Sequence, residues 1–385
     1  MTRPLDTPLQ RIAIIGTGLM GGSIGLAVRR AGLANAISGF DLEPGHSKRA
    51  LERNSLTEVA DSMEQAVRDA QLVVIATPVD SVPDTYASFR DFIAPGAVVT
   101  DVGSSKSRIV AEISKHIPVG THFVGGHPIA GSEQEGIDGA SADLFESSTW
   151  ILTPTPETDT DTYGALVRFL GGLGAKVLAL EPKRHDELVA FTSHLPQVLS
   201  SVLMGFAAEI SSAEGGLPLV TAGGFKDMTR ISASSADLWV GILKENREIT
   251  SEVLERFEGA FSDARSLIEG QDWEALRSFL NSARQAHADL PRKPGQDPKA
   301  IAELLVPVPD RPGVLAEVTT GIGELGINIE DMNIVHSKGR GTIHLTLASI
   351  DLDRATSALR ELGYEPHLGP LGPLGPLGPR EHEDA

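Results

Sequence analysis

Short apolar runs alternate with amphipathic stretches through the N-terminal part of the chain. The apolar runs cover residues 11–15, 36–41, 72–77, 97–104 and 122–126. Between several of them, apolar residues recur at helical spacing, as over 19–31, 79–93 and 104–116. The runs lack polar alternation, which is typical of strands that are covered on both faces. This order predicts βαβ units with a parallel sheet, and therefore an α/β domain over residues 1–181.

The pattern changes after residue 181. Residues 182–290 carry little strand signal, and apolar residues recur at three-and-four spacing over 257–268 and 273–287. This spacing predicts an all-helical domain. Residues 291–300 are rich in proline and glycine and predict a linker.

Residues 301–367 show a third pattern of short strand-like and helix-like segments. A strand at 302–309 precedes a helix that opens near Pro312, a hairpin around 338–341, a second helix and a possible strand at 364–367. This order, βαββαβ, predicts a small α+β domain. The Leu-Gly-Pro repeats within 368–385 predict a disordered tail.

Composition narrows the classes of protein to consider. The 385 residues include 33 Lys and Arg against 52 Asp and Glu, a net charge of −19, and no cysteine. The acidity is spread along the chain, which argues against a nucleic-acid partner because phosphate binding needs clustered basic side chains. Without cysteine there is no disulfide, thiol nucleophile or Cys-based zinc site, and we predict no metal site. An anionic substrate would need a local cation.

The same chain shows no targeting signal that we recognise. The apolar run near the N-terminus is short and ends at a glycine, which indicates a strand rather than a signal peptide. No run of 18 apolar residues is found, so we expect no membrane span. Together with the absent cysteines, this favours a cytoplasmic protein.

A glycine-rich turn after the first predicted strand has the pattern G-x-G-x-x-G. The pattern alone is weak, but a strand precedes it, a helix follows, and Asp41 ends the second strand 20 residues after the last glycine. In Rossmann-type domains such a turn holds a pyrophosphate at the helix N-terminus, and the acid accepts bonds from ribose hydroxyls. Because Asp41 would repel a 2′-phosphate, NAD is favoured over NADP. The candidate cofactor-binding residues are Gly16, Gly18, Leu19, Met20, Gly21, Asp41 and Thr77.

Two other interpretations of this turn stay open. A glycine-rich turn can connect a strand to a helix without binding any nucleotide. Residues 21–25 also match G-x-S-x-G, the nucleophile elbow of hydrolases, but Ser23 would lie inside the first helix rather than at a strand-to-helix turn.

Polar residues follow two later strands, at the edge where open parallel sheets bind ligands. Ser104 lies in the segment DVGSSK, and His127 lies in GGHPIAGSE, where we expect a loop that faces the cleft. A single histidine is more often structural than catalytic, but this position favours a catalytic role.

The helical part carries two further candidates. His194 lies in a helix that we expect to be broken by Pro196. Asp227 and Arg230 are three residues apart, so they can pair on one helix face. An arginine oriented by a carboxylate suits the binding of an acidic substrate, although an ordinary surface ion pair has the same pattern.

These motifs, in this order, resemble the prephenate dehydrogenase family. The resemblance covers residues 10–290 and depends on GTGLMGGS (16–23), DVGSSK (101–106), GGHPIAGSE (125–133), SHLP (193–196) and GGFKDMTRIS (223–232). It implies a helical dimerisation domain, a homodimer, and a reaction in which prephenate loses a hydride to NAD+ and its ring carboxylate as CO2. It implies that His127 is the general base and that Ser104 hydrogen-bonds beside it.

The resemblance also implies a set of substrate-binding residues. These are Arg230 as carboxylate clamp, Asp227 that orients it, Glu133 at the pocket entrance, and His194 and Trp239 in the pocket. Relatives often read S-H-L-P-H, whereas this chain has Gln197 in the last position, which cannot carry charge. Arogenate therefore stays an alternative substrate.

Residues 304–334 separately resemble an ACT domain, through D-R-P-G-x-L-A and G-I-N-I. This implies amino-acid binding near the first strand–helix turn, with L-tyrosine as the natural effector. The candidate effector-binding residues are Asp310, Gly313, Val314, Leu315 and Asn328. A purely structural dimerisation module, a catalytically silent amino-acid sensor and a generic 3-hydroxyacid or imine oxidoreductase remain alternatives.

Overall fold

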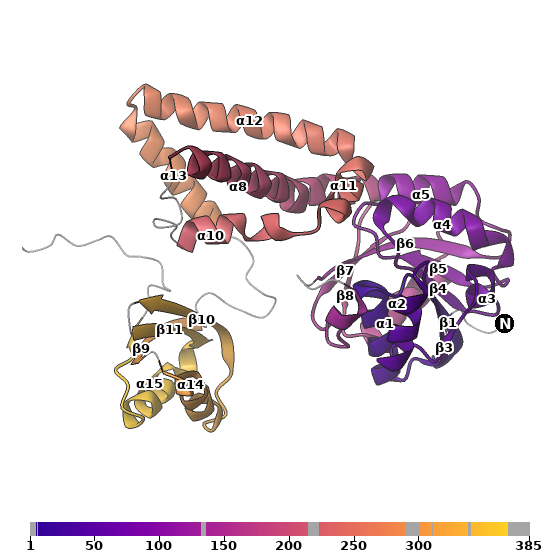
Figure 1. Cartoon of the computed structure of the whole chain (residues 1–385), viewed down its shortest axis with the longest axis horizontal. Helices are drawn as coiled ribbons and strands as arrows, with labels where there is room; N and C mark the ends of the chain where they lie inside the picture. Colours follow the sequence, from indigo (N-terminus) through magenta and orange to yellow (C-terminus); the bar gives the residue numbers. More distant parts are fainter. Residues whose placement is uncertain are drawn as a thin grey trace, which may run out of the picture. The chain divides into compact units, whose positions relative to one another are not determined.

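A computed structural model describes residues 5, 7–131, 136–214, 223–288, 301–309, 311–337 and 340–368. The chain forms two compact units, residues 1–265 and 266–385. Figure 1 labels their helices and strands.

The first unit is built on an eight-stranded sheet with the order β3-β2-β1-β4-β5-β6-β7-β8. The strands are β1 (Leu9–Ile15), β2 (Ala34–Phe40), β3 (Glu58–Val59), β4 (Leu72–Ile75), β5 (Val98–Asp101), β6 (His122–Ile129), β7 (Thr149–Thr153) and β8 (Lys176–Ala179). Neighbouring strands are parallel except β6 and β7, which are antiparallel. The expected α/β domain with a parallel sheet is confirmed.

Helices cover both faces of this sheet. They are α1 (Leu19–Ala31), α2 (Pro44–Glu52), α3 (Met63–Val67), α4 (Val82–Phe89), α5 (Ser107–Ser114) and α6 (Thr160–Gly172). Successive residues of β1 fall into two separate buried clusters, since Ile12 and Ile14 belong to one and Ala13 and Ile15 to the other. The sheet is thus buried on both faces, which explains why its strands lack polar alternation.

Helices follow the last strand of the sheet (Figure 1). They are α7 (Pro182–Val189), α8 (Leu195–Glu214), α10 (Gly223–Thr229), α11 (Ala236–Glu245), α12 (Arg247–Glu269) and α13 (Trp273–Ala288). The expected break at Pro196 is wrong: a π-helical turn, Ala190–His194, joins α7 to α8 without interruption. A π-helical turn can accommodate proline, whose missing backbone N–H removes one hydrogen bond from a regular α-helix. Such turns are frequent at functional sites.

One stretch of this part passes a simple test for membrane crossing. Within the described residues, the continuous helix over 182–211 is long and apolar enough to span a bilayer by length and composition alone. A single such helix is weak support for a span, because apolar helices of soluble proteins pass the same test.

The small C-terminal sheet has the order β10-β11-β9-β12, with antiparallel neighbours. Its elements are β9 (Ile301–Pro309), α14 (Val314–Gly323), β10 (Ile329–Ser337), β11 (Arg340–Ala348), α15 (Leu352–Glu361) and β12 (His367–Leu368). The predicted βαββαβ order is confirmed, although the last strand begins at His367 rather than at 364. The predicted linker at 291–300 and the tail beyond 368 lie outside the described residues.

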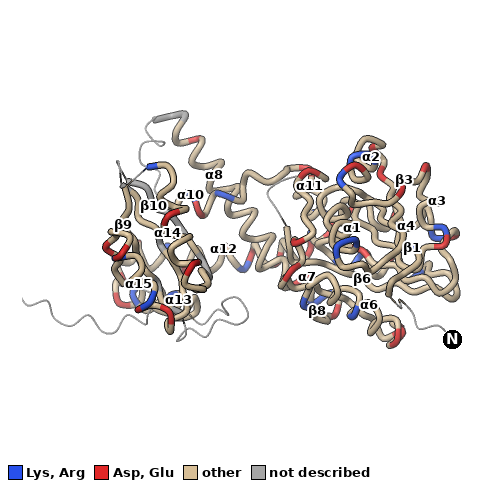
Figure 2. The backbone as a smooth tube through the Cα atoms, turned by 90° about the horizontal axis from the view of Figure 1, so that it is seen from below, with Lys and Arg blue, Asp and Glu red and all other residues tan. Residues whose placement is uncertain are grey.

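Charged residues are distributed over both units. Figure 2 shows acidic and basic positions interspersed along the described chain rather than gathered in one segment. Any strong positive potential must therefore be local.

Candidate active site

The glycine-rich turn lies between β1 and α1, as expected. Gly16 has φ +93°, and a Cβ there would lie 2.5 Å from the carbonyl oxygen of Ala76. A Cβ on Gly21 would collide with the carbonyl oxygen of Gly16, whereas one on Gly18 would meet no atom within 4 Å. Gly18 thus borders open space at the N-terminus of α1, which has no side-chain cap and no acid in its first turn. This cradle fits a bound pyrophosphate.

Asp41 lies directly after β2, beside the same turn. Its Oδ2 accepts hydrogen bonds from the Thr17 amide at 2.7 Å and the Thr17 hydroxyl at 3.2 Å, and its Oδ1 accepts one from the Glu43 amide at 3.0 Å. These bonds fix the carboxylate at the carboxyl edge of the sheet. Thr77 lies just after β4, and its hydroxyl is 3.4 Å from that of Thr85. The arrangement can hold a dinucleotide whose ribose faces Asp41.

His127 lies within β6 rather than in a loop, which corrects the expectation. The parallel pairing of β6 with β5 ends at Val124, after which β6 pairs with antiparallel β7, and His127 stands opposite Ile151. The second pairing keeps the chain extended beyond the end of β5. His127 therefore stands, partly buried, just past the carboxyl end of the parallel strands.

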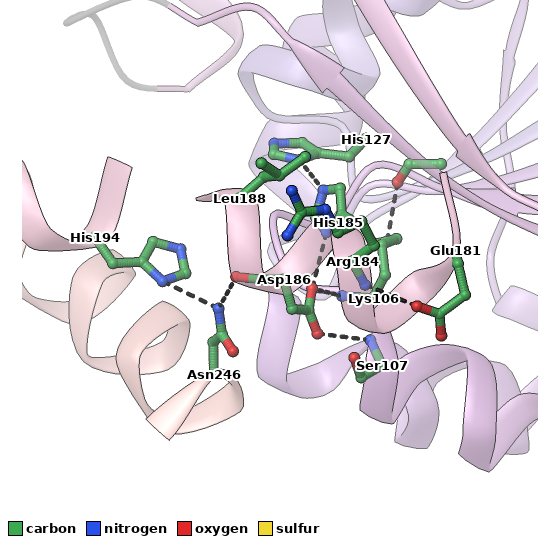
Figure 3. Close-up of polar contacts among 12 residues, drawn as sticks. Lys106, Ser107, His127, Glu181, Arg184, His185, Asp186, Leu188, His194 and Asn246 are labelled. Carbon is green, nitrogen blue, oxygen red and sulfur yellow. Dashed lines mark hydrogen bonds and ion pairs between the residues drawn. The ribbon is translucent and has the colours of Figure 1, made fainter. Parts of the chain in front are cut away.

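A line of hydrogen bonds leads from His127 into the interior (Figure 3). Its Nδ1 is 2.8 Å from Nε2 of His185, and Nδ1 of His185 is 2.8 Å from Oδ1 of Asp186. Oδ1 of Asp186 also accepts a bond from the Lys106 amide at 2.7 Å, and Oδ2 accepts one from the Ser107 amide at 2.8 Å. The side chains of His185 and Asp186 are 0% and 2% exposed. The ring of His127 is thus anchored through α7 to the N-terminus of α5.

A buried ion pair lies beneath this line. Lys106 Nζ contacts Asp101 Oδ2, and both side chains are fully buried. Lys106 Nζ also donates to the carbonyl oxygen of Gly126 at 2.9 Å, and Asp101 Oδ1 accepts from the Gly126 amide at 3.1 Å. The pair therefore fixes the backbone directly before His127.

A second histidine cluster lies deeper in the helical part. His194 Nδ1 is 3.2 Å from the Thr250 hydroxyl and 3.3 Å from Asn246 Nδ2, which also donates to the backbone oxygen of Asp186 at 2.9 Å. The ring of Trp239 meets that of His194 edge-on, with 6.0 Å between the ring centres. The sequence-predicted pocket residues His194 and Trp239 are thus in contact.

Both histidines are held neutral at pH 7. Burial lowers the pKa of His127 well below 6.5, and repulsion from His185, Lys106 and His194 in their protonated forms acts in the same direction. Burial also lowers the pKa of His194 to about 4, against the opposing effect of Asp186. A neutral imidazole can accept a proton, so His127 is in the form that general-base chemistry requires.

The other predicted substrate residues are less closely tied to His127. Ser104 lies, partly buried, in the loop between β5 and α5. Asp227 lies in α10, but Arg230 begins a separate 3₁₀ turn, Arg230–Ala233, so the two do not share one continuous α-helical face as expected. Arg230 is exposed, and its turn packs against α8. Glu133 lies outside the described residues.

The predicted effector residues lie at the start of α14. Gly313 caps this helix with φ +88°, Val314 is buried in the core of the small domain, and Leu315 is 36% exposed. Asn328 directly precedes β10. Asp310 lies outside the described residues.

Lys106, His185 and Asp186 are central to the geometry but absent from the sequence-predicted site residues. Lys106 offers a signal, because a lysine follows small residues directly after a buried strand. His185 and Asp186 lie in the run KRHDE, which has the composition of an exposed helix face. Within the described residues, no group of three or more metal-ligating side chains is placed to hold an ion.

Three family models match the chain. Residues 24–179 match "Prephenate dehydrogenase, nucleotide-binding domain", residues 181–282 match "Prephenate dehydrogenase, dimerization domain", and residues 302–366 match "ACT domain". The first two matches together span most of the chain before the small domain.

Named relatives agree with these models. The chain is 33% identical to a prephenate dehydrogenase of Bacillus subtilis over 353 residues, which is 88% of this chain and 92% of that protein. It is 30% identical to a cyclohexadienyl dehydrogenase of Zymomonas mobilis over 287 residues, which is 74% of this chain and 97% of that protein.

Solved structures show the same relationship. A prephenate dehydrogenase from Aquifex aeolicus, in complex with hydroxyphenyl propionate and NAD+, superposes with a TM-score of 0.69 at 30% identity, covering 74% of this chain and 99% of that one. An arogenate dehydrogenase from Synechocystis superposes with a TM-score of 0.63 at 28% identity, covering 72% and 99%. The similarity therefore includes enzymes named for either substrate.

Proposed function

The chain belongs to the prephenate dehydrogenase family, and we propose that it catalyses the NAD+-dependent oxidative decarboxylation of prephenate to 4-hydroxyphenylpyruvate. The observation that carries this proposal is His127. It is a neutral histidine fixed past the carboxyl end of β5 in the same sheet that bears the dinucleotide cradle. This is the edge where open α/β sheets bind cofactor and substrate.

The cofactor residues follow from the geometry of the turn. The amides at the start of α1, beside Gly18, would face the pyrophosphate, and Asp41 would accept bonds from the ribose hydroxyls. Bound NAD+ supplies the hydride acceptor. The fixed carboxylate of Asp41 favours NAD+ over NADP+, because it would lie against the extra phosphate.

His127 supplies the proton chemistry. As the hydride leaves C4 of the substrate, the C4 hydroxyl must lose its proton, and a neutral imidazole can take it. Ser104, in the loop beside the end of β5, would hydrogen-bond the substrate near that hydroxyl. Loss of the ring carboxylate as CO2 then makes the ring aromatic, and the phenolate oxygen that results can take the proton back from His127.

Substrate binding requires positive charge in an acidic protein. His194 stays neutral at pH 7, so it can offer a hydrogen bond but no charge. Arg230 is therefore the proposed carboxylate clamp, oriented by Asp227, with Glu133 at the pocket entrance and Trp239 against His194 in the pocket. Gln197 lies three residues beyond His194 and is 5% exposed. Its Oε1 has no hydrogen-bond partner among the described residues. Because buried polar atoms are usually hydrogen-bonded, Gln197 is a candidate to hydrogen-bond a polar group of the substrate.

We also propose that the enzyme is a cytoplasmic homodimer. Large apolar side chains are exposed on α8, α10, α11 and α12 in the first unit, namely Val202, Phe206, Met228, Val240 and Phe261. A second copy would remove this surface from water, in keeping with the family model for this region. Sedimentation should show a dimer, and a monomer at micromolar concentration would refute this part.

Tyrosine feedback through the ACT domain is a further part of the proposal. The turn that precedes α14 would bind the effector with Gly313, Val314, Leu315, Asn328 and Asp310. Millimolar tyrosine should inhibit the enzyme and raise its melting temperature, since a ligand stabilises the state that binds it. If neither changes, the sensing role is lost.

The experiment that tests the activity is a four-way assay of NADH or NADPH formation. Prephenate and arogenate are each supplied with NAD+ and with NADP+. We expect turnover with prephenate and NAD+. Turnover only with arogenate would move the assignment to the sister activity, and turnover with neither would refute the proposal.

A further inference from the structure

We propose that His185 and Asp186 are positioning residues that hold His127 in a single tautomer, with its proton on Nδ1 and its lone pair on Nε2. The inference rests on the proposed role of His127 as the base. It concerns two buried side chains of α7 that form one line with the ring of His127 (Figure 3).

The direction of the hydrogen bonds is set at Asp186. This carboxylate can only accept, and it already accepts from the amides of Lys106 and Ser107, at 2.7 and 2.8 Å. Its contact with His185 Nδ1, at 2.8 Å, therefore requires a proton on that nitrogen. The pKa of Asp186 is lowered despite its burial, because His185 and Ser107 hydrogen-bond it, so it stays a carboxylate.

The direction of the hydrogen bond at Asp186 then determines the tautomer of His127. His185 carries a proton on Nδ1, so in the neutral imidazole the lone pair lies on Nε2, 2.8 Å from Nδ1 of His127. His127 must donate that proton, which leaves its own Nε2 as the proton acceptor. The opposite tautomer would set two lone pairs against each other in a buried place.

The same contact also matters once His127 has taken a proton. The same hydrogen bond from Nδ1 of His127 to His185 then has a charged donor, which makes it stronger than in the substrate-free state. The other charged or titratable groups near His127 are Lys106, which is paired with Asp101, and His194, so no acid among the described residues touches the ring itself. His185 is thus the described side chain placed to stabilise the charge.

Two substitutions at one position separate positioning from packing. In His185→Leu the acceptor is removed but apolar volume is kept. In His185→Gln the side-chain amide oxygen can reach the place of Nε2 and accept from His127. We expect kcat to fall by about 10- to 100-fold in H185L, the ratio that a hydrogen bond to a charged group contributes, and by less than about fivefold in H185Q. KM for prephenate and NAD+ should stay within about twofold in both variants, because the contact lies behind the base.

A matched control uses a histidine far from this line. His116 is exposed after α5, and His116→Leu should leave kcat and both KM values unchanged. Equal kcat in H185L and wild type, or an equal loss in H185L and H185Q, would refute the positioning role.

The tautomer can be observed without turnover. Nitrogen NMR of the full chain, with isotope-labelled histidine and no substrate, distinguishes protonated from unprotonated ring nitrogens, and the His127 signals are those absent in His127→Asn. We expect Nδ1 of His127 to carry the proton in wild type and a mixture of tautomers in H185L. A wild-type His127 protonated on Nε2 overturns the proposal even if H185L does not fold. An enzyme inactive on prephenate and arogenate would refute the proposed function but would leave this measurement valid.

Discussion

Because His194 is buried, we expect the free energy of unfolding to depend on pH, by an amount that follows from its pKa. His194 is 1% exposed, and burial lowers its pKa from 6.5 to about 4. Between these two values the unfolded chain binds a proton that the folded chain does not, so the free energy of unfolding must fall as the pH falls. Each unit of pKa difference is worth about 1.4 kcal/mol, so the full loss is about 3 kcal/mol and is reached near pH 4.

The perturbation that isolates this effect is His194→Asn. At pH 7 the variant should be less stable by about 1 kcal/mol, because its bonds to Thr250 and Asn246 are not fully replaced. As the pH falls from 6.5, wild type alone carries the His194 penalty, so the two stability curves should converge and then cross.

The assay is urea unfolding at a series of pH values between 4 and 8, with both proteins at one concentration so that any association contributes equally. Other carboxylates and histidines titrate in both proteins and cancel in the difference. Curves that stay parallel across this range would refute the assignment of a neutral, buried His194.

Three further predictions concern individual side chains. Lys106→Met should lower the free energy of unfolding by about 3–5 kcal/mol, because it leaves Asp101 buried without its cation. Urea unfolding at pH 7 measures this loss, and a loss below about 1 kcal/mol would contradict the buried ion pair. Asp41→Asn should lower the preference for NAD+ over NADP+ by about 10- to 100-fold, which is the contribution of a hydrogen bond to a charged group. The ratio of kcat/KM for the two cofactors measures this preference, and an unchanged ratio would contradict the role of the carboxylate. Gln197→Leu should raise KM for prephenate without destabilising the protein, because Oε1 has no partner among the described residues; an unchanged KM would remove it from the substrate site.

The sequence predicts the sheet domain well where strands are buried on both faces. β1, β2, β4 and β5 contain short apolar runs, as is typical of strands that are covered on both faces. β8 is less recognisable, because it is an edge strand whose Leu178 is 48% exposed. The extended course of β6 beyond β5 depends on pairing with β7, a partner that follows 20 residues later and whose direction reverses that of the sheet.

The residues of the candidate site can be predicted from the sequence only where they lie in a short, recognisable motif. The glycine-rich turn and Asp41 lie in short motifs at strand ends, so their placement follows from the order of the elements. The motif around His127 indicates the correct edge of the sheet, but the place of His127 within β6 depends on the pairing with β7. His185 and Asp186 gain their role because α7 packs against α5, and that contact is tertiary. The run that contains them is charged, as an exposed helix would be, although both side chains are buried.

The most direct test of the account is the rate of NADH formation from prephenate by His127→Asn, measured beside its affinity for NAD+. Asparagine cannot act as a base, so kcat should fall by roughly 10²–10⁴-fold. The affinity for NAD+ should be unchanged, because the cofactor cradle lies on β1, α1 and β2. A rate within about tenfold of wild type, with NAD+ still bound, would contradict the claim that His127 takes the substrate proton.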